Sequence, residues 1–244
     1  MALLFAFLGL LLAAFVKGCF GFGFPTIATP AVALLTDVRT AIVILVLPNI
    51  VLDFLQVARR PLEVPALLRR HSVLYLFGVA GTFVGTKLLV TLPPRVAVLT
   101  LGLLVLTFVG MSALEVMPRI PPGWERPLAP PLGFASGVLG GLTNVPGLLL
   151  IIYFYSLGLP KGEFVRSNAL SFLVFKLAQL AAVWQFQLLT GRLFLLSLLA
   201  GGLGLGAFRA GVWVQDRADP ARFNRWILAV LAGMGLLTVL RGLR

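Results

Sequence analysis

Long apolar runs separated by short polar segments dominate the pattern along the chain. A helix that spans a bilayer needs about 20 mostly apolar residues, because the hydrocarbon layer is about 30 Å thick and each helical residue rises about 1.5 Å. Six runs approach or exceed this length, the last being the shortest: 40–58, 72–92, 96–114, 164–190, 193–214 and 226–240. The pattern therefore predicts an all-α integral membrane protein.

Two further apolar stretches, 2–35 and 128–158, are each interrupted near the middle, at Lys17–Pro25 and at Gly137–Gly147. Glycine disfavours a helix interior, and proline lacks a backbone donor. Each stretch is therefore predicted to form two half-helices that meet at a Gly/Pro break. The chain starts without a positively charged segment, so the first stretch is expected to stay in the membrane rather than to be a cleaved signal.

The two halves of the chain match at an offset of about 122 residues. Four glycine or basic positions have a counterpart at this offset: Gly18 and Gly140, Arg39 and Lys161, Lys87 and Arg209, and Arg95 and Arg217. This match predicts two four-segment repeats, 1–118 and 119–244, within one membrane domain. Each repeat begins with a broken hairpin, and the polar, proline-rich segment 115–127 links them.

Positive charge in the loops distinguishes two topologies. If both broken stretches are re-entrant hairpins, the halves are inverted, and eleven Lys and Arg residues lie inside against five outside. If each stretch crosses once, the halves are parallel and the counts are nine and seven. Because Lys and Arg favour cytoplasmic loops, the counts favour inverted repeats with the 59–71 loop inside.

Composition excludes a soluble domain, since 59% of the residues are hydrophobic and only 11% are charged, against about 25% in soluble proteins. The net charge is +12, but the basic residues lie in short loop clusters, which argues against nucleic acid binding. Cys19 is the only cysteine, so an intrachain disulfide and a cysteine metal cluster are excluded. His71, the only histidine, stands beside two arginines and is expected to be a solvated loop residue.

Enzymatic chemistry is not encoded in a recognisable form. The segment Gly133–Gly137 is similar to the nucleophile turn of an intramembrane serine protease, but its spacing is wrong and no histidine lies in a span to act as base. Phosphate-loop and dinucleotide motifs are also absent from the sequence. We therefore expect no catalytic residue, no cofactor and no bound metal.

Charged residues inside apolar runs are the main candidates for function, because each costs at least about 2.5–3.5 kcal/mol at the bilayer centre. They include Lys17, Asp53 and Lys176. The first N–H groups of a half-helix attract anions, and paired breaks in corresponding halves indicate a transporter's substrate site. Simpler interpretations stay open: the glycines only allow close packing, Lys17 only reaches to the interface, or Asp53 and Lys176 only form buried ion pairs.

The hypothesis that follows is an anion site between the two breaks, near mid-membrane. Lys17 or Lys176 would supply the balancing positive charge, and Asp53 would neutralise the other lysine or take up a proton in coupling. The candidate substrate-binding residues are Lys17, Gly21, Phe22, Gly23, Phe24, Pro25, Thr26, Asn49, Thr143, Asn144, Val145, Pro146, Gly147, Asn168 and Lys176.

The sequence at the breaks resembles the sulfite exporter TauE/SafE family, also called the TSUP permeases. The resemblance rests on these segments: Gly18–Pro25 with Pro30 and Leu34–Ala41 in the first half, and Gly137–Gly141 with Pro146-Gly147 and Leu157–Lys161 in the second. It covers nearly the whole chain as two repeats. The chain departs from the family pattern at Thr143-Asn144-Val145, where more glycine is usual, and this leaves the substrate open.

The resemblance implies a multi-pass permease of the inner (cytoplasmic) membrane that carries sulfite, sulfoacetate or another small anion. Its expected partners are the anionic substrate and the lipid bilayer, without nucleic acid, and it is compatible with a homodimer. The hypothesis is a secondary transporter that works by alternating access. An anion channel and a membrane subunit that transports nothing on its own stay open as alternatives.

Overall fold

The computed structural model describes residues 2–114, 120–121, 123–217, 236, 238–240 and 242–243. Over these residues the regular structure is helical. Five helices are long and apolar enough to cross a membrane: α3 (Val38–Val57), α5 (Ser72–Thr91), α6 (Pro94–Ala113), α9 (Lys161–Gln185) and α10 (Gly191–Arg217). They confirm the five corresponding sequence predictions, and the sixth predicted span, 226–240, lies almost entirely outside the described residues.

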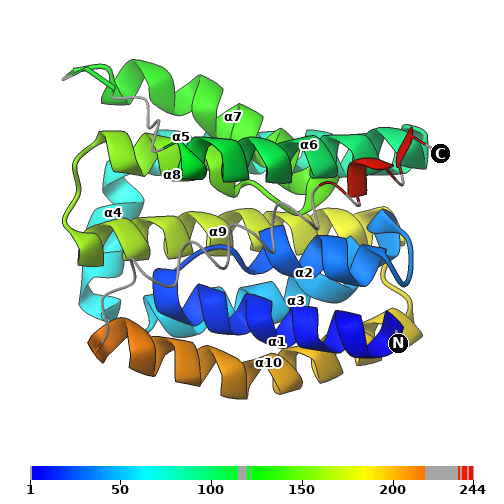
Figure 1. The fold of residues 1–244 in the computed structure, drawn as a ribbon. Coiled ribbons are helices and arrows are strands. Elements are labelled where there is room, and N and C mark those ends of the chain that lie inside the picture. The colour runs from blue at the N-terminus through cyan, green and yellow to red at the C-terminus, as the bar shows by residue number, and fades with distance from the viewer. Residues whose placement is uncertain are drawn as a thin grey trace.

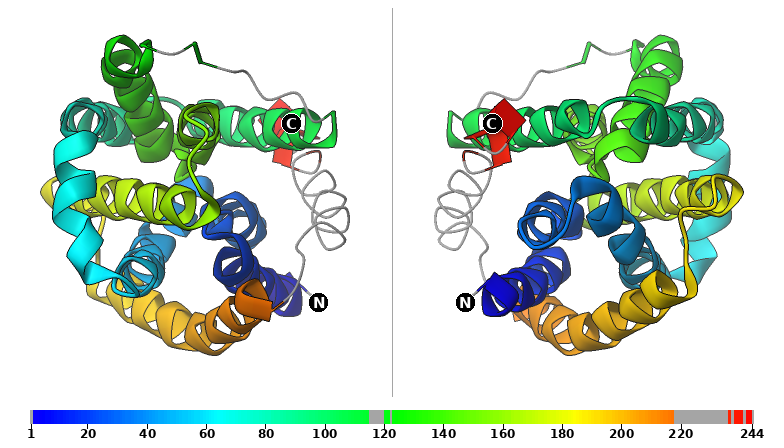
Figure 2. Two further views of the ribbon diagram at one scale, coloured as in Figure 1. Left: turned by 90° about the vertical axis from the view of Figure 1, so that its left-hand side faces the viewer. Right: turned by 90° about the vertical axis from the view of Figure 1, so that its right-hand side faces the viewer.

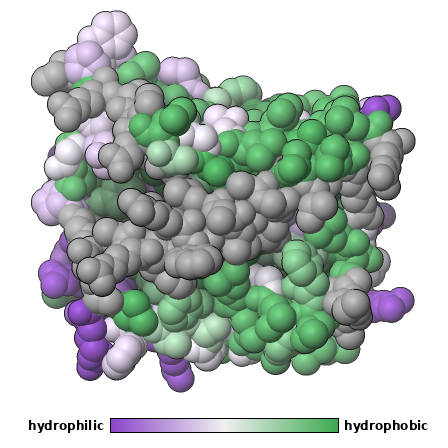
Figure 3. All heavy atoms as spheres, viewed as in Figure 1, coloured by the Kyte–Doolittle hydropathy of each residue, from purple (hydrophilic) through white to green (hydrophobic). Residues whose placement is uncertain are grey.

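Side-chain exposure fits a lipid environment around these helices. Leu198, Leu199 and Leu203 of α10 are each about half exposed, although they lie in the middle of an apolar helix. In Figure 3, hydrophobic residues predominate above and below the band of grey residues, and the most hydrophilic residues lie towards the left and right margins, where the helices end. The chain is therefore an integral membrane protein.

Each predicted broken stretch consists of two helices. The first is α1 (Ala2–Phe20) and α2 (Phe24–Ala33), and the second is α7 (Glu125–Thr143) and α8 (Gly147–Ser156). Both breaks are shorter than predicted, because Lys17 to Phe20 belong to α1 and Gly137 to Thr143 belong to α7. The predicted linker is also too long, since α7 already begins at Glu125.

Positive φ angles mark both turns. Gly21 and Gly23 have φ of 81° and 95°, which glycine adopts without strain, and Asn144 has φ of 70°, which asparagine tolerates better than most residues. Proline follows each turn, at Pro25 in the first turn of α2 and at Pro146 just before α8. Proline is tolerated at these positions because the N–H that it lacks has no intrahelical acceptor there.

Both hairpins turn back towards the end from which they start. In Figure 1, α1 begins and α2 ends at the right-hand end, whereas α7 begins and α8 ends at the left-hand end. The left-hand end also contains η1 (Pro61–Glu63), α4 (Val64–Arg70), the loop 157–160 and the end of α10. We call it the arginine-rich end, because the segment 58–71 alone carries Arg59, Arg60, Arg69 and Arg70.

Close helix pairs hold the bundle together at glycines. The most extensive contacts are between α5 and α7 and between α1 and α10, and α10 lies at the periphery when the molecule is viewed from its ends (Figure 2). A Cβ on Gly137 would lie 2.1 Å from the Gly78 oxygen, and one on Gly18 would lie 2.3 Å from the Phe208 oxygen. The close-packing interpretation is therefore correct for Gly18 and Gly137, whereas the positive φ angles explain Gly21 and Gly23.

Candidate functional site

Two helices in the interior, α3 and α9, carry the polar residues of the site. On α3, Asn49, Asp53 and Gln56 are spaced four and three residues apart, so they share one helix face, and none is more than 1% exposed. On α9, Lys176 and Gln179 lie one turn apart and are equally buried. The two helices contact one another directly, which places two buried polar faces inside the bundle.

Lys17 forms a fully buried ion pair with Asp53. Its Nζ lies 2.5 Å from Asp53 Oδ1, and both side chains have no exposed surface. The same ammonium lies 5.1 Å from the centre of the Phe172 ring on α9, within the range of a cation–π interaction. The simpler interpretation, in which Lys17 reaches out to the interface, is therefore wrong.

Lys176 is held differently, by oxygens that carry no net charge. Its Nζ donates to the Asn144 backbone oxygen at 3.1 Å, to Asn144 Oδ1 at 2.5 Å and to Gln179 Oε1 at 2.5 Å. An ammonium has three N–H donors, and all three have an acceptor here. At the second break, the backbone and the side chain of Asn144 therefore both contact the Lys176 ammonium of α9.

Further hydrogen bonds join this cluster to α7 and to α2. Gln179 Nε2 donates to the Gly140 oxygen at 3.1 Å. Asn144 Nδ2 donates to Thr29 Oγ1 at 2.9 Å, and Thr29 lies in α2, the half-helix that follows the first break. The two broken hairpins are thus in direct polar contact around Lys176.

Charge within this buried region does not balance. In the described helices, the fully buried ionisable groups inside the spans and hairpins include two lysines, Lys17 and Lys176, and one acid, Asp53. Asp53 lies close enough to Lys176 for their charges to interact, but its hydrogen bond goes to Lys17. With all three groups charged, one positive charge remains without an opposite charge, in surroundings where that is costly.

Several buried polar atoms near these residues have no hydrogen-bond partner. They include both amide atoms of Asn49, Oδ2 of Asp53 and Oδ1 of Asn168. Buried polar groups are normally satisfied, so such atoms mark a place where a small polar ligand could bind. The predicted residues Asn49 and Asn168 are thus present in the interior, but Asn168 Nδ2 donates to the Phe164 oxygen of its own helix.

The first break lies against apolar side chains rather than against Lys176. A Cβ on Gly21 would meet Val165, and the Phe22 ring is 6.3 Å from the rings of both Phe108 and Phe164. The other predicted residues of this break are buried at the start of α2, namely Gly23, Phe24, Pro25 and Thr26.

The predicted residues of the second break lie near the lysines. Gly147 faces Phe172, Pro146 packs against Gly140, and Val145 belongs to the same apolar core as α1 to α3. Thr143 donates to the Leu139 oxygen of its own helix and accepts from the Val145 N–H. The Lys176 ammonium and the second break therefore form one continuous buried cluster.

Four residues of the site are absent from the sequence prediction: Thr29, Gln56, Phe172 and Gln179. Helical spacing carried a signal for two of them, because Gln56 follows Asp53 by three residues and Gln179 follows Lys176 by three. Thr29 and Phe172 gave no such signal, since their contacts come from another helix.

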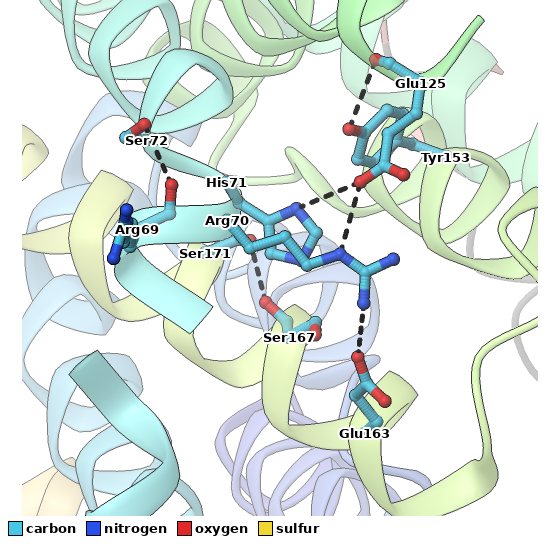
Figure 4. A network of polar contacts seen from close by, with 9 residues as sticks. All are labelled: Arg69, Arg70, His71, Ser72, Glu125, Tyr153, Glu163, Ser167 and Ser171. Atoms are coloured by element: carbon cyan, nitrogen blue, oxygen red, sulfur yellow. Dashed lines mark hydrogen bonds and ion pairs between the residues drawn. The ribbon is translucent and has the colours of Figure 1, made fainter. Parts of the chain in front are cut away.

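A second polar network lies at the arginine-rich end (Figure 4). Arg70 contacts Glu125 at 3.3 Å and Glu163 at 2.7 Å, so it joins the starts of α7 and α9 to α4. His71 lies beside it with only 2% of its surface exposed and packs edge-on against the Phe154 ring at 5.0 Å. The prediction of a solvated His71 is therefore wrong, because α7 and α8 cover it.

Acid should destabilise the protein through His71. Burial, and then the neighbouring Arg70 charge, lower the pKa of the imidazole from 6.5 to about 4, and Glu125 opposes this shift. Between these values the unfolded chain binds the proton more readily, so stability present above pH 6.5 is lost as pH falls towards 4. The expected loss between pH 7 and 5 is about 2 kcal/mol.

Thermal unfolding in detergent at a series of pH values measures this effect. The control is His71→Phe, which keeps an aromatic ring among Tyr75, Tyr153 and Phe154 but cannot be protonated. The melting temperature of this variant should fall less between pH 7 and 5 than that of the unmodified protein. Equal pH dependence in both proteins would contradict the assignment.

Comparisons with known proteins add one finding. The model of the family described as "Sulfite exporter TauE/SafE" matches residues 5–238, nearly the whole chain. No curated protein matches the chain, and no solved structure does.

Proposed function

The chain belongs to the sulfite exporter TauE/SafE family, a family of membrane permeases, and on that premise we propose that it is a secondary transporter of a small anion. Its substrate is a sulfur-containing oxyanion or an organosulfonate, such as sulfite or sulfoacetate. Alternating access moves this anion across the inner (cytoplasmic) membrane.

The burial of Lys176, whose hydrogen-bond partners in the described residues are uncharged oxygens, is the observation that carries this proposal. A desolvated anion needs an opposite charge or several directed donors before it leaves water. Lys176 provides the charge, because Asp53 already neutralises Lys17. The N-terminus of α8, which follows the second break, provides further donors, since this helix has no side-chain cap.

Burial of the site supports alternating access. Lys17, Asp53, Asn144 and Gln179 have no exposed surface, and Lys176 is 1% exposed. This burial supports a carrier, in which helices move to admit the anion, over a pore that stays open. Asp53 is the candidate for proton coupling, because its Oδ2 has no hydrogen-bond partner and could accept a proton during the cycle.

Helix pairing supports inverted repeats as the moving parts. When the first repeat, 1–118, is matched to the second, 119–244, α1 corresponds to α7, α3 to α9 and α5 to α10. The α1–α10 contact then corresponds to the α7–α5 contact, and α3–α10 corresponds to α9–α5. Figure 1 also draws α1 and α7 in opposite directions, as two inverted halves require.

Flux into proteoliposomes tests the function. A carrier gives sulfite or sulfoacetate uptake that saturates and is accelerated by the same anion on the other side of the membrane. An anion channel gives flux without saturation or counterflow, and a membrane subunit gives no flux on its own.

Labelling of single cysteines tests the inverted topology. Both variants are made in a Cys19→Ala background. Leu62→Cys places an exposed thiol at the arginine-rich end, and Arg192→Cys places one in the first turn of α10. The inverted arrangement predicts that a membrane-impermeant maleimide labels them from opposite sides. Parallel repeats would place both thiols on the same side, so labelling from one side would contradict the proposal.

A further inference from the structure

A cleft of about 290 Å³ opens at the arginine-rich end, next to the buried polar face of α3. Its lining includes Gln56, Arg59, Arg60, Arg166, Gln215 and Asp216. The cleft brings together the end of α3, the start of α9 and the end of α10. Its volume is near the lower limit of about 300 Å³ for small-molecule pockets, so it can admit a small anion.

Charge in the cleft favours an anion. Arg59 NH2 contacts both oxygens of Asp216, at 3.0 and 2.8 Å. Arg60 and Arg166 share a single carboxylate, Glu63, at 3.3 and 2.5 Å. Three guanidinium groups therefore face two carboxylates, and one positive charge is left over, as it is at the buried site.

Two buried donors in the cleft have no partner. Gln56 is 1% exposed, and neither its Nε2 nor its Oε1 makes a hydrogen bond. The Nε of Arg166 is also buried without a partner, although the same guanidinium holds Glu63 through NH2. A guanidinium N–H and an amide N–H are both donors suited to an oxyanion.

Gln56 connects this cleft to the buried site. It lies three residues after Asp53 on one face of α3, a rise of about 4.5 Å along the helix. The polar face continues inward from Gln56 to the Lys17–Asp53 ion pair and then to Asn49. An anion in the cleft is therefore one helical turn from the first buried charge.

We propose that this cleft is an outer anion-binding subsite, at which Arg166 and Gln56 hold the anion on its way between water and the buried site. The subsite rests on the proposed function, because its ligand is the transported anion. It makes Gln56 and Arg166 binding residues of the transporter in addition to Lys176.

Calorimetric titration with sulfite tests the subsite in a Lys176→Met background, where binding at the buried site is already weakened. One sulfite should still bind to this purified variant in detergent. Adding Arg166→Gln should weaken that binding about tenfold, as expected for the loss of one charge-assisted hydrogen bond. Adding Gln56→Leu, which keeps the side-chain size but removes the donor, should also weaken it.

The matched control is Arg69→Gln, which removes an exposed arginine from the same end of the molecule but outside the cleft. Equal sulfite affinity in the Arg166, Gln56 and Arg69 variants would overturn the subsite. So would sulfite binding to the unmodified protein with none to Lys176→Met, although the proposed function would stand. Absence of binding and flux in the unmodified protein would instead contradict the proposed function.

Discussion

Replacing Lys17 with Met should lower the stability of the folded protein by about 3–5 kcal/mol, the usual cost of breaking a buried ion pair. The substitution removes the one hydrogen-bonded partner that Asp53 has among the described residues, in a site with no exposed surface. The carboxylate must then take up a proton or depend on the more distant charge of Lys176, which gives it no hydrogen bond, and both outcomes cost free energy. Thermal unfolding in detergent at pH 7 measures the loss.

The double variant Lys17→Met/Asp53→Leu is the matched control. It replaces both members of the pair with apolar groups, a change that is often neutral or stabilising for buried pairs. Its stability should therefore return close to that of the unmodified protein. A single variant as stable as the unmodified protein would contradict the ion pair, and so would a double variant no more stable than the single one.

Gly211→Val should prevent stable packing of α10 against α1. A Cβ at this position would lie 2.1 Å from the Phe15 backbone oxygen and 2.9 Å from Gly18 Cα. Backbone atoms cannot move aside as the end of a flexible side chain can, so the two helices would have to separate. We expect a loss above the usual 1–3 kcal/mol for an overpacked core, and little folded protein after detergent extraction.

Gly206→Val on the same helix is the control, because a Cβ there meets nothing within 4 Å. Both substitutions change helix propensity and side-chain size equally, so the difference between them isolates the contact with α1. Size-exclusion chromatography should show a monodisperse peak for Gly206→Val and aggregation for Gly211→Val. Similar behaviour of the two variants would show that the α1–α10 contact does not limit stability.

Hydrophobic length predicted the spans well, because a bilayer fixes the number of apolar residues that a helix needs. The runs 40–58 and 72–92 became α3 and α5 within two residues at either end. Both hairpins were also predicted, since glycine and proline interrupt long apolar stretches for local reasons. The extent of each break was overestimated, because Gly18 and Gly137 serve contacts with α10 and α5 rather than a turn of their own chain.

Contacts between distant segments could not be predicted from one sequence. Lys17 and Asp53 are 36 residues apart, and Lys176 and Asn144 are 32 apart, so their pairing depends on how the helices pack. These residues were candidates for the site because polar residues are rare in apolar runs, but the sequence did not show which residue pairs with each charge. The predicted exposure of His71 was wrong for the same reason, because the helices that bury this residue lie far away in the sequence.

The proposed anion site depends most on the positive charge of Lys176, and the affinity of the purified protein for sulfite tests this charge most directly. Isothermal titration should compare the unmodified protein with Lys176→Met and Lys17→Met under one buffer and detergent. We predict that Lys176→Met weakens sulfite binding at least about tenfold, or roughly 1.4 kcal/mol, because Asp53 neutralises Lys17, the other buried lysine of the cluster. If neither lysine variant changes the affinity by that factor, charge compensation by a buried lysine is contradicted.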